Sequence, residues 1–136
     1  MDEIFYKVEN DLSGIEFGEV LINSTIKRPT NDLERLEKMC RNSNLIITAR
    51  KDNKLIGVAR ALTDFSYCTY LSDLAVDLAF QKIGIGKRLL IELKKNTPQA
   101  TLFLLAAPES INYYSKIGLI PFEHCFILKD INQITI

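Results

Sequence analysis

Residues 74–90 read LAVDLAFQKIGIGKRLL and carry the most information in the chain. An apolar run, Leu74–Val76, leads to a turn that contains Gly84 and Gly86, and a cationic amphipathic helix follows. Two glycines one residue apart allow the main chain to curl so that successive N–H groups point into one concavity. The helix behind the turn adds the positive end of its dipole. This arrangement predicts a site for an anionic ligand that carries phosphate.

Two common nucleotide-binding motifs do not fit this turn. The sequence lacks G-x-x-x-x-G-K-[ST], and Leu89 stands where G-x-G-x-x-G needs its third glycine. A nucleotide-binding module is therefore disfavoured, although the prediction of a phosphate site remains.

Composition limits the classes of protein to which the chain can belong. Its 136 residues predict one domain over 1–136, large enough to bury a core. With 47% hydrophobic residues, 25% charged residues and no net charge, nothing supplies the basic surface that nucleic acids require. No apolar run approaches the roughly eighteen residues that span a bilayer, so no membrane role is expected.

The cysteines predict a reducing compartment. Cys40, Cys68 and Cys125 are odd in number and widely spaced, and His124 is the single histidine that could join them. This pattern argues against structural zinc. Because the N-terminus also lacks a basic region followed by a long apolar run, a cytoplasmic protein is expected.

Hydrophobic periodicity predicts the order of the elements. Asn31 and Glu34 are expected to cap the second helix, and the run 102–106 is expected to form a central strand covered on both faces. The order predicts an α/β fold with a mixed, mostly antiparallel central sheet and helices on both faces. Strands are predicted over 4–8, 45–50, 55–62, 69–76 and 102–106, with a last strand or pair of strands over 122–129. Helices are predicted over 13–24, 31–42, 84–96 and from Pro108 to Gly118.

Two segments resemble motifs of the GCN5-related N-acetyltransferase (GNAT) family. Residues 81–86, QKIGIG, resemble the family's Gln/Arg-x-x-Gly-x-Gly/Ala signature, and residues 114–119, YSKIGL, are similar to its Tyr-x-x-x-Gly-Phe segment. The chain departs from the family pattern at Ala107, where many members have an asparagine that helps to hold the cofactor, and at Leu119, where phenylalanine is usual.

The resemblance implies acetyl-CoA as co-substrate, bound mainly by main-chain groups. The glycine turn would bind the pyrophosphate of coenzyme A, and the strand before it would diverge from its neighbour and pair with the pantetheine amides. The cofactor-binding residues implied in this way are Leu74, Val76, Gln81, Lys82, Ile83, Gly84, Ile85, Gly86 and Lys87.

The resemblance also implies an acyltransferase that acts on a primary amine. Tyr114 would protonate the departing thiolate as general acid, although a buried aromatic residue is the alternative interpretation. Asp73 is a candidate general base, with Tyr70 and Asp64 as alternatives. Direct attack by the amine in a ternary complex is preferred, because no cysteine has a visible activating base.

The acceptor amine is not specified by the sequence. Its contacts would come from 13–30 and from Asp64–Tyr67, where Phe65 and Tyr67 favour an apolar or aromatic amine, although a protein or peptide amine is left open. A homodimer is also left open. A non-catalytic acyl-CoA-binding sensor or partner domain is the alternative function.

Overall fold

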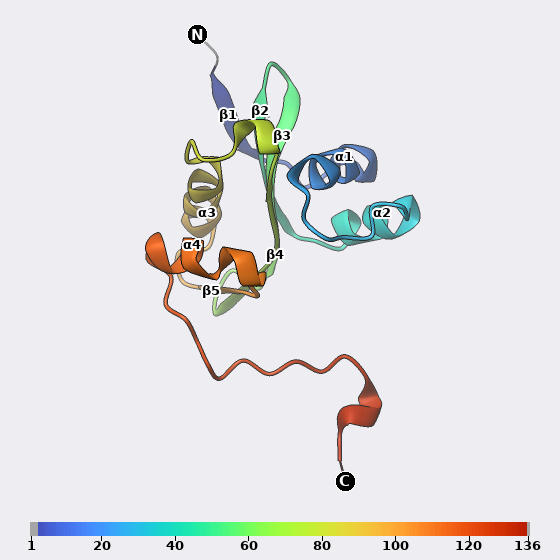
Figure 1. Cartoon of the computed structure of the whole chain (residues 1–136), viewed down its shortest axis with the longest axis vertical. Helices are drawn as coiled ribbons and strands as arrows, with labels where there is room; N and C mark the ends of the chain where they lie inside the picture. Colours follow the sequence, from blue (N-terminus) through green and yellow to red (C-terminus); the bar gives the residue numbers. More distant parts are fainter. Residues whose placement is uncertain (1–2, 136) are drawn as a thin grey trace. The chain divides into compact units, whose positions relative to one another are not determined.

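The computed structural model describes residues 3–135 (Figure 1). By backbone contacts the chain forms two compact units, Met1–Leu105 and Ala106–Ile136, and each is described by itself below. Within the described residues, no helix is long and apolar enough to cross a membrane. The same residues contain no group of three or more His, Cys, Asp or Glu side chains that could hold a metal ion.

The first unit is built on one mixed sheet of five strands in the order β1-β2-β3-β4-β5. The first four strands are antiparallel to their neighbours, whereas β4 and β5 are parallel. Parallel neighbours need a crossover, which helix α3 (Ile85–Asn96) supplies. The strands are β1 (Ile4–Val8), β2 (Leu45–Lys51), β3 (Lys54–Thr63), β4 (Cys68–Val76) and β5 (Thr101–Leu104).

The β2–β3 hairpin forms where the sequence predicts it. Asp52 and Asn53 both have left-handed backbone, with φ of 49° and 67°. Two such residues in a two-residue turn match the right-handed twist of the flanking strands, and Asp and Asn tolerate this region well. Local turn chemistry therefore sets this register.

Helices cover both faces of the sheet, as Figure 1 shows for α3 on one side and α1 and α2 on the other. Helix α1 (Gly14–Ser24) and helix α2 (Leu33–Arg41) pack their apolar residues on Val58 and Ala75. On the opposite face, the space beside Gly57 is filled by Ile85 and Leu89 of α3. The core below α1 and α2 includes Leu12, Phe17, Val20, Leu21, Leu36, Cys40 and Ile46.

Helix α2 begins one residue later than the capping pattern predicts. The N-cap is Asp32, whose carboxylate accepts a hydrogen bond from the N–H of Arg35, and not Asn31. Asp and Asn are about equally good N-cap residues. Because Asn31 and Asp32 are adjacent, the sequence alone does not determine which of them caps the helix. The predicted end of this helix near Asn42 is correct.

Two predictions about later strands are wrong. Strand β5 is the outermost strand of the five-stranded sheet, and the side chains of Thr101 and Phe103 are exposed. Residues 122–129 form no strand in the described structure, where Phe126 is 91% exposed. An apolar run shows a tendency to extend, but a strand forms only where its N–H and C=O groups find a ladder partner.

The second unit contains the short helix α4 (Ile111–Lys116), preceded by the 3-10 turn η2 (Pro108–Ser110). As predicted, Pro108 begins this helical segment, and Gly118 ends it with φ of 108°. The N–H groups of Gly118 and Leu119 donate to the carbonyls of Ser115 and Tyr114, which is a Schellman motif.

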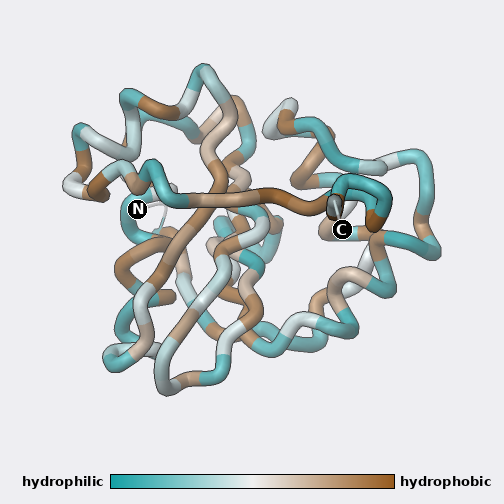
Figure 2. The backbone as a smooth tube through the Cα atoms, turned by 90° about the horizontal axis from the view of Figure 1, so that it is seen from below, coloured by the Kyte–Doolittle hydropathy of each residue, from teal (hydrophilic) through white to brown (hydrophobic). Residues whose placement is uncertain are grey.

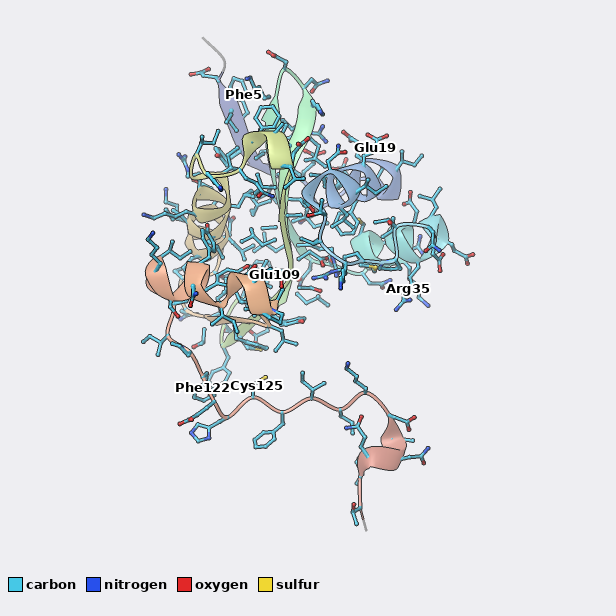
Figure 3. All side chains as sticks on the ribbon, viewed as in Figure 1. Phe5, Glu19, Arg35, Glu109, Phe122 and Cys125 are labelled. Atoms are coloured by element: carbon cyan, nitrogen blue, oxygen red, sulfur yellow. The ribbon has the colours of Figure 1, made fainter. Side chains whose placement is uncertain are left out.

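The end of the second unit is extended and apolar. Figure 2 shows a hydrophobic stretch of the tube before the C-terminus, and Figure 3 shows Phe122 and Cys125 on this segment. The 3-10 turn η3 (Ile131–Gln133) follows, and the side chains of Asp130 and Gln133 form its capping box.

An ion-pair network joins β1, β2 and α1 in the first unit. The guanidinium of Arg50 donates to both oxygens of Glu9 and to both oxygens of Glu16. The hydrogen bond from Arg50 lowers the pKa of Glu9 below its ordinary value. This network fixes the N-terminal strand against the hairpin and the start of α1.

Candidate active site

A break in the sheet between β4 and β5 is the central feature of the candidate site. The two strands pair from Cys68 opposite Thr101 to Leu71 opposite Leu104. Strand β4 then continues to Val76 without a β5 partner, because β5 ends at Leu104. The β5-facing edge of residues 72–76 therefore offers main-chain groups to an extended ligand, as strand addition requires.

A β-bulge lies at the start of this open edge. On the β3 side, Arg60 pairs with Asp73 and Ala61 pairs with Leu71, so Ser72 is the extra residue of β4. A bulge bends its strand and increases the local twist. The bend in β4 therefore falls just after its last pair with β5, Leu71.

The predicted residues Leu74 and Val76 both lie on the open segment, where their side chains are half-buried. They pair with Ala59 and Gly57 on the β3 side. The side-chain amide of Gln81 donates a 2.8 Å hydrogen bond to the carbonyl of Val76. Gln81 therefore ties the segment before the glycine turn back to the end of β4.

A short 3-10 turn, η1 (Leu78–Phe80), carries the chain from β4 to the glycine turn. The buried carboxylate of Asp77 accepts from the N–H of Ala79 and lies 3.5 Å from the ammonium of Lys54. The N–H of Asp77 donates to Ile56 on β3. Asp77 thus anchors η1 to the sheet, a role that its sequence context does not indicate.

The glycine turn has left-handed backbone at Lys82 and Gly84, with φ of 68° and 91°. Gly84 is the N-cap of α3, and no side chain caps this end of the helix in the described structure. The first N–H groups of a helix have no partner within it, so those of residues 85–87 are available to an anion. Gly86 lies inside α3 and does not supply a left-handed position, so the two glycines have different roles.

The surroundings of the turn fit a pyrophosphate group. A Cβ atom built on Gly84 would meet no atom within 4 Å, which leaves open space above the turn. The exposed side chains of Lys82 and Lys87 supply positive charge in and beside the turn, whereas the guanidinium of Arg88 is paired with Glu92. The side chain of Ile85, the first residue of α3, is buried in the core, and this packing fixes the position of the turn that precedes it.

Asp73, the candidate base, lies buried in an ion-pair network. Its two carboxylate oxygens accept from Nε of Arg28 and from Nε of Arg60, and its side chain is 0% exposed. Both oxygens are therefore engaged with cations. This geometry favours a structural role for Asp73 over proton abstraction.

The two alternative base candidates have different surroundings. The carboxylate of Asp64 accepts from the N–H groups of Tyr67, Ser66 and Cys68, which lowers its pKa to about 2. A carboxylate with so low a pKa is a weak base at neutral pH. The ring of Tyr70 is half-buried and packs against Phe103 with centroids 5.3 Å apart.

Tyr114 lies on α4, which belongs to the second unit. Its ring packs edge to face against Tyr113, with centroids 5.3 Å apart. Burial raises the pKa of Tyr113 above its ordinary value. The role of Tyr114 as general acid stays a prediction.

The arginines Arg28 and Arg60 were not identified from the sequence. Arg60 is buried in the middle of an apolar strand, a position where a charged residue almost always has a partner. That observation could have indicated a buried ion pair, although not its partner. The sequence around Arg28 does not indicate a buried ion pair, because this segment shows only a break between two predicted helices.

Comparison with known proteins assigns the family. The chain matches the family described as "Acetyltransferase (GNAT) domain" over residues 10–132. A relative named "Uncharacterized N-acetyltransferase ycf52" from Pyropia yezoensis is 33% identical over 102 residues, which cover 70% of this chain and 57% of that protein. The protein of the same name from Porphyra purpurea is 32% identical with the same coverage. The chain thus spans little more than half the length of these relatives.

Solved structures show the same fold. The GNAT family acetyltransferase SP0256 from Streptococcus pneumoniae TIGR4 has a TM-score of 0.79 at 20% identity, over 97% of this chain and 100% of that chain. Aminoglycoside N-acetyltransferase AAC(6')-Iy in complex with CoA has a TM-score of 0.74 at 14% identity, over 96% and 97% of the two chains.

The chain therefore belongs to the GNAT acetyltransferase family, whose co-substrate is acetyl-CoA. The predicted family and the predicted fold class are both confirmed. The family assignment also supports the predicted class of enzyme, an acyltransferase.

Gly84→Val should weaken the binding of coenzyme A at least tenfold. A left-handed backbone costs a residue with a Cβ about 1–2 kcal/mol, and about 1.4 kcal/mol is a tenfold change in affinity. Titration calorimetry with coenzyme A measures the effect. Asn53→Val is the matched control, since it puts the same strain on a left-handed residue of the β2–β3 turn, outside the proposed cofactor site, and it should bind like the wild type. Wild-type affinity in a folded Gly84→Val protein would exclude the turn as the phosphate site.

Proposed function

We propose that this chain is an acetyl-CoA-dependent N-acetyltransferase that acts on a primary amine of a small molecule. The observation that carries the proposal is the open edge of β4, which leads through η1 to the uncapped N-terminus of α3. One continuous path thus offers main-chain groups for an extended amide-containing arm and then N–H groups for phosphates. The family model covers 10–132, so we propose that 1–136 acts as one GNAT domain.

The cofactor contacts follow the same path. Main-chain groups of Leu74 and Val76 would pair with the pantetheine amides. Those of the turn would bind the pyrophosphate, with Gln81 holding the turn to β4 through the Val76 carbonyl. The turn residues assigned in this way are Lys82, Ile83, Gly84, Ile85, Gly86 and Lys87.

The bound thioester supplies an electrophilic carbonyl and a thiolate leaving group. The attacking amine must first lose a proton, because an alkylammonium group stays charged until about pH 10. Asp73 could accept that proton only if one of its two guanidinium partners moved away. We therefore propose that the proton leaves through water, while Tyr114 protonates the thiolate.

The acceptor is proposed to be an apolar or aromatic amine. Leu62, Tyr70 and Phe103 lie opposite one another on β3, β4 and β5, and the side chains of Leu62 and Phe103 are exposed. In the loop before β4, Phe65 and Tyr67 are also exposed. The similarity in fold to an aminoglycoside acetyltransferase does not extend to its acceptor, because these residues offer aromatic rings where a polycation needs carboxylates.

The alternative function keeps the cofactor site and lacks turnover, as in an acyl-CoA sensor. An acetyltransferase would release free thiol from acetyl-CoA in the presence of a suitable amine, whereas a sensor would not. A homodimer and a cytoplasmic location also remain proposals. Exposed free thiols at Cys68 and Cys125 favour a reducing compartment.

Tyr114→Phe should lower kcat by about 10²-fold, the usual contribution of one proton-transfer group. The substitution keeps the ring and removes the hydroxyl, so the contact with Tyr113 should survive. Thiol release under saturating acetyl-CoA measures kcat. Tyr113→Phe is the control and should keep wild-type turnover, whereas an unchanged kcat in Tyr114→Phe would remove Tyr114 from the mechanism.

A panel of primary amines, aromatic and aliphatic, tests the proposed activity itself. Direct attack requires acetyl-CoA and the amine to be bound together, so initial rates should give intersecting double-reciprocal lines. A Cys68→Ala, Cys125→Ala double variant should retain activity. Parallel lines with an acetylated cysteine peptide would contradict direct attack, and no thiol release with any amine would favour the sensor.

A further inference from the structure

The loop between α1 and α2 reaches the bulge in β4 through one side chain. Arg28 lies 45 residues before Asp73 in sequence, and its Nε donates to Oδ1 of Asp73. Its Nη2 donates to the carbonyl of Ser72 at 3.0 Å, and its Nη1 donates to the carbonyl of Lys27 at 2.7 Å. A single guanidinium therefore contacts Ser72, the extra residue of the bulge, the neighbouring Asp73 and its own loop.

A second arginine holds the same bulge from within the sheet. Nη2 of Arg60 donates to the hydroxyl of Ser72 at 2.8 Å, and its Nε donates to Oδ2 of Asp73. Its Nη1 donates to the hydroxyl of Ser43 at 2.9 Å. Both oxygens of Ser72 and both oxygens of Asp73 are thus occupied by arginine donors. These contacts compensate for the ladder bonds that a bulge disrupts.

The two arginines differ in how deeply they are buried. The side chain of Arg60 is 8% exposed, so its removal would leave a buried carboxylate short of a partner and would endanger the fold. The side chain of Arg28 is 33% exposed and comes from a loop. Without Arg28, Asp73 would still be paired with Arg60, so the protein should fold. The bulge would lose only the hydrogen bonds that Arg28 donates to Ser72 and Asp73.

We propose that Arg28 is a positioning residue that, through Asp73 and Ser72, holds the end of β4 in the shape that binds coenzyme A. The bulge lies directly after the last β4–β5 pair, at Leu71, and two residues before Leu74. A shift of one residue there would turn the following side chains to the opposite face of the sheet. This inference rests on the proposed function, since it assigns the open edge to the cofactor.

The arrangement also links two parts of the site. Arg28 lies within residues 13–30, the segment proposed to contact the acceptor, and its partners lie on the strand proposed to bind the cofactor. Movement of the loop would therefore alter the edge that the cofactor uses. Arg28 would then influence the affinity for coenzyme A without touching it.

Arg28→Gln tests the proposal with two measurements, hydrogen exchange of the free protein and titration calorimetry with coenzyme A. Exchange of the amides of 72–76 should rise about tenfold, and affinity for coenzyme A should fall about tenfold, the scale of a lost hydrogen bond to a charged group. Lys27→Ala, an exposed cation in the same loop, is the matched control and should behave as the wild type. Arg28→Lys keeps the positive charge but loses the planar set of guanidinium donors, so its exchange and its affinity should lie between those of Arg28→Gln and the wild type.

Each outcome decides a separate question. Wild-type exchange at 72–76 in a folded Arg28→Gln protein would overturn the positioning role. Loss of the fold in both Arg28 variants would also overturn it, since Arg28 would then be required for folding. If the wild type failed to bind coenzyme A, the proposed function would fall, and hydrogen exchange would still decide whether Arg28 supports the bulge.

Discussion

The early end of the β4–β5 ladder, which leaves the second half of β4 without a neighbour on that side, is the constraint on which the rest of the structure depends. Strand β4 is nine residues long and β5 is four, and they share a ladder only at the end near Cys68. A sheet edge in the middle of a domain is normally paired or covered, because unpaired N–H and C=O groups are costly when buried. Here the open edge continues into the turn that begins α3. We propose that the two features form one elongated site for a ligand with amides at one end and phosphates at the other.

Electrostatics at the bulge explain how the end of β4 is held without a neighbouring strand on its β5 side. Asp73 is buried between Arg28 and Arg60, and Ser72 accepts from the same two arginines. A buried ion pair is often no more stabilising than an apolar pair of the same size, because desolvation offsets the attraction. Its directional hydrogen bonds instead fix the position of each partner. We infer that this network determines the geometry of the bulge more than it adds to the free energy of unfolding.

Features set by local sequence were predicted well. The hairpin around Asp52 and Asn53, the helix that begins after Gly84 and the cap at Gly118 depend on turn chemistry within a few residues. The glycine turn was likewise recognised, although the left-handed positions are Lys82 and Gly84 and do not include Gly86. Backbone conformation of a single residue within a turn depends on the packing of the flanking elements.

Features set by contacts distant in sequence were missed. The bulge at Ser72 and the pairing of Arg28 with Asp73 depend on residues that come together only after folding. The apolar composition of 122–129 suggested a strand, but the described residues of the second unit contain no strand with which it could pair. Asp73 is a candidate base from the sequence because the sequence does not show that Arg28 and Arg60 contact its carboxylate.

The central claim is that the open edge of β4 and the glycine turn form one binding site for coenzyme A. An NMR titration of ¹⁵N-labelled protein with coenzyme A tests this claim most directly, since it reports on each main-chain amide. The largest shifts are expected at the amides of 73–76 and 82–87. Shifts confined to other parts of the chain, or none at saturating coenzyme A, would contradict it.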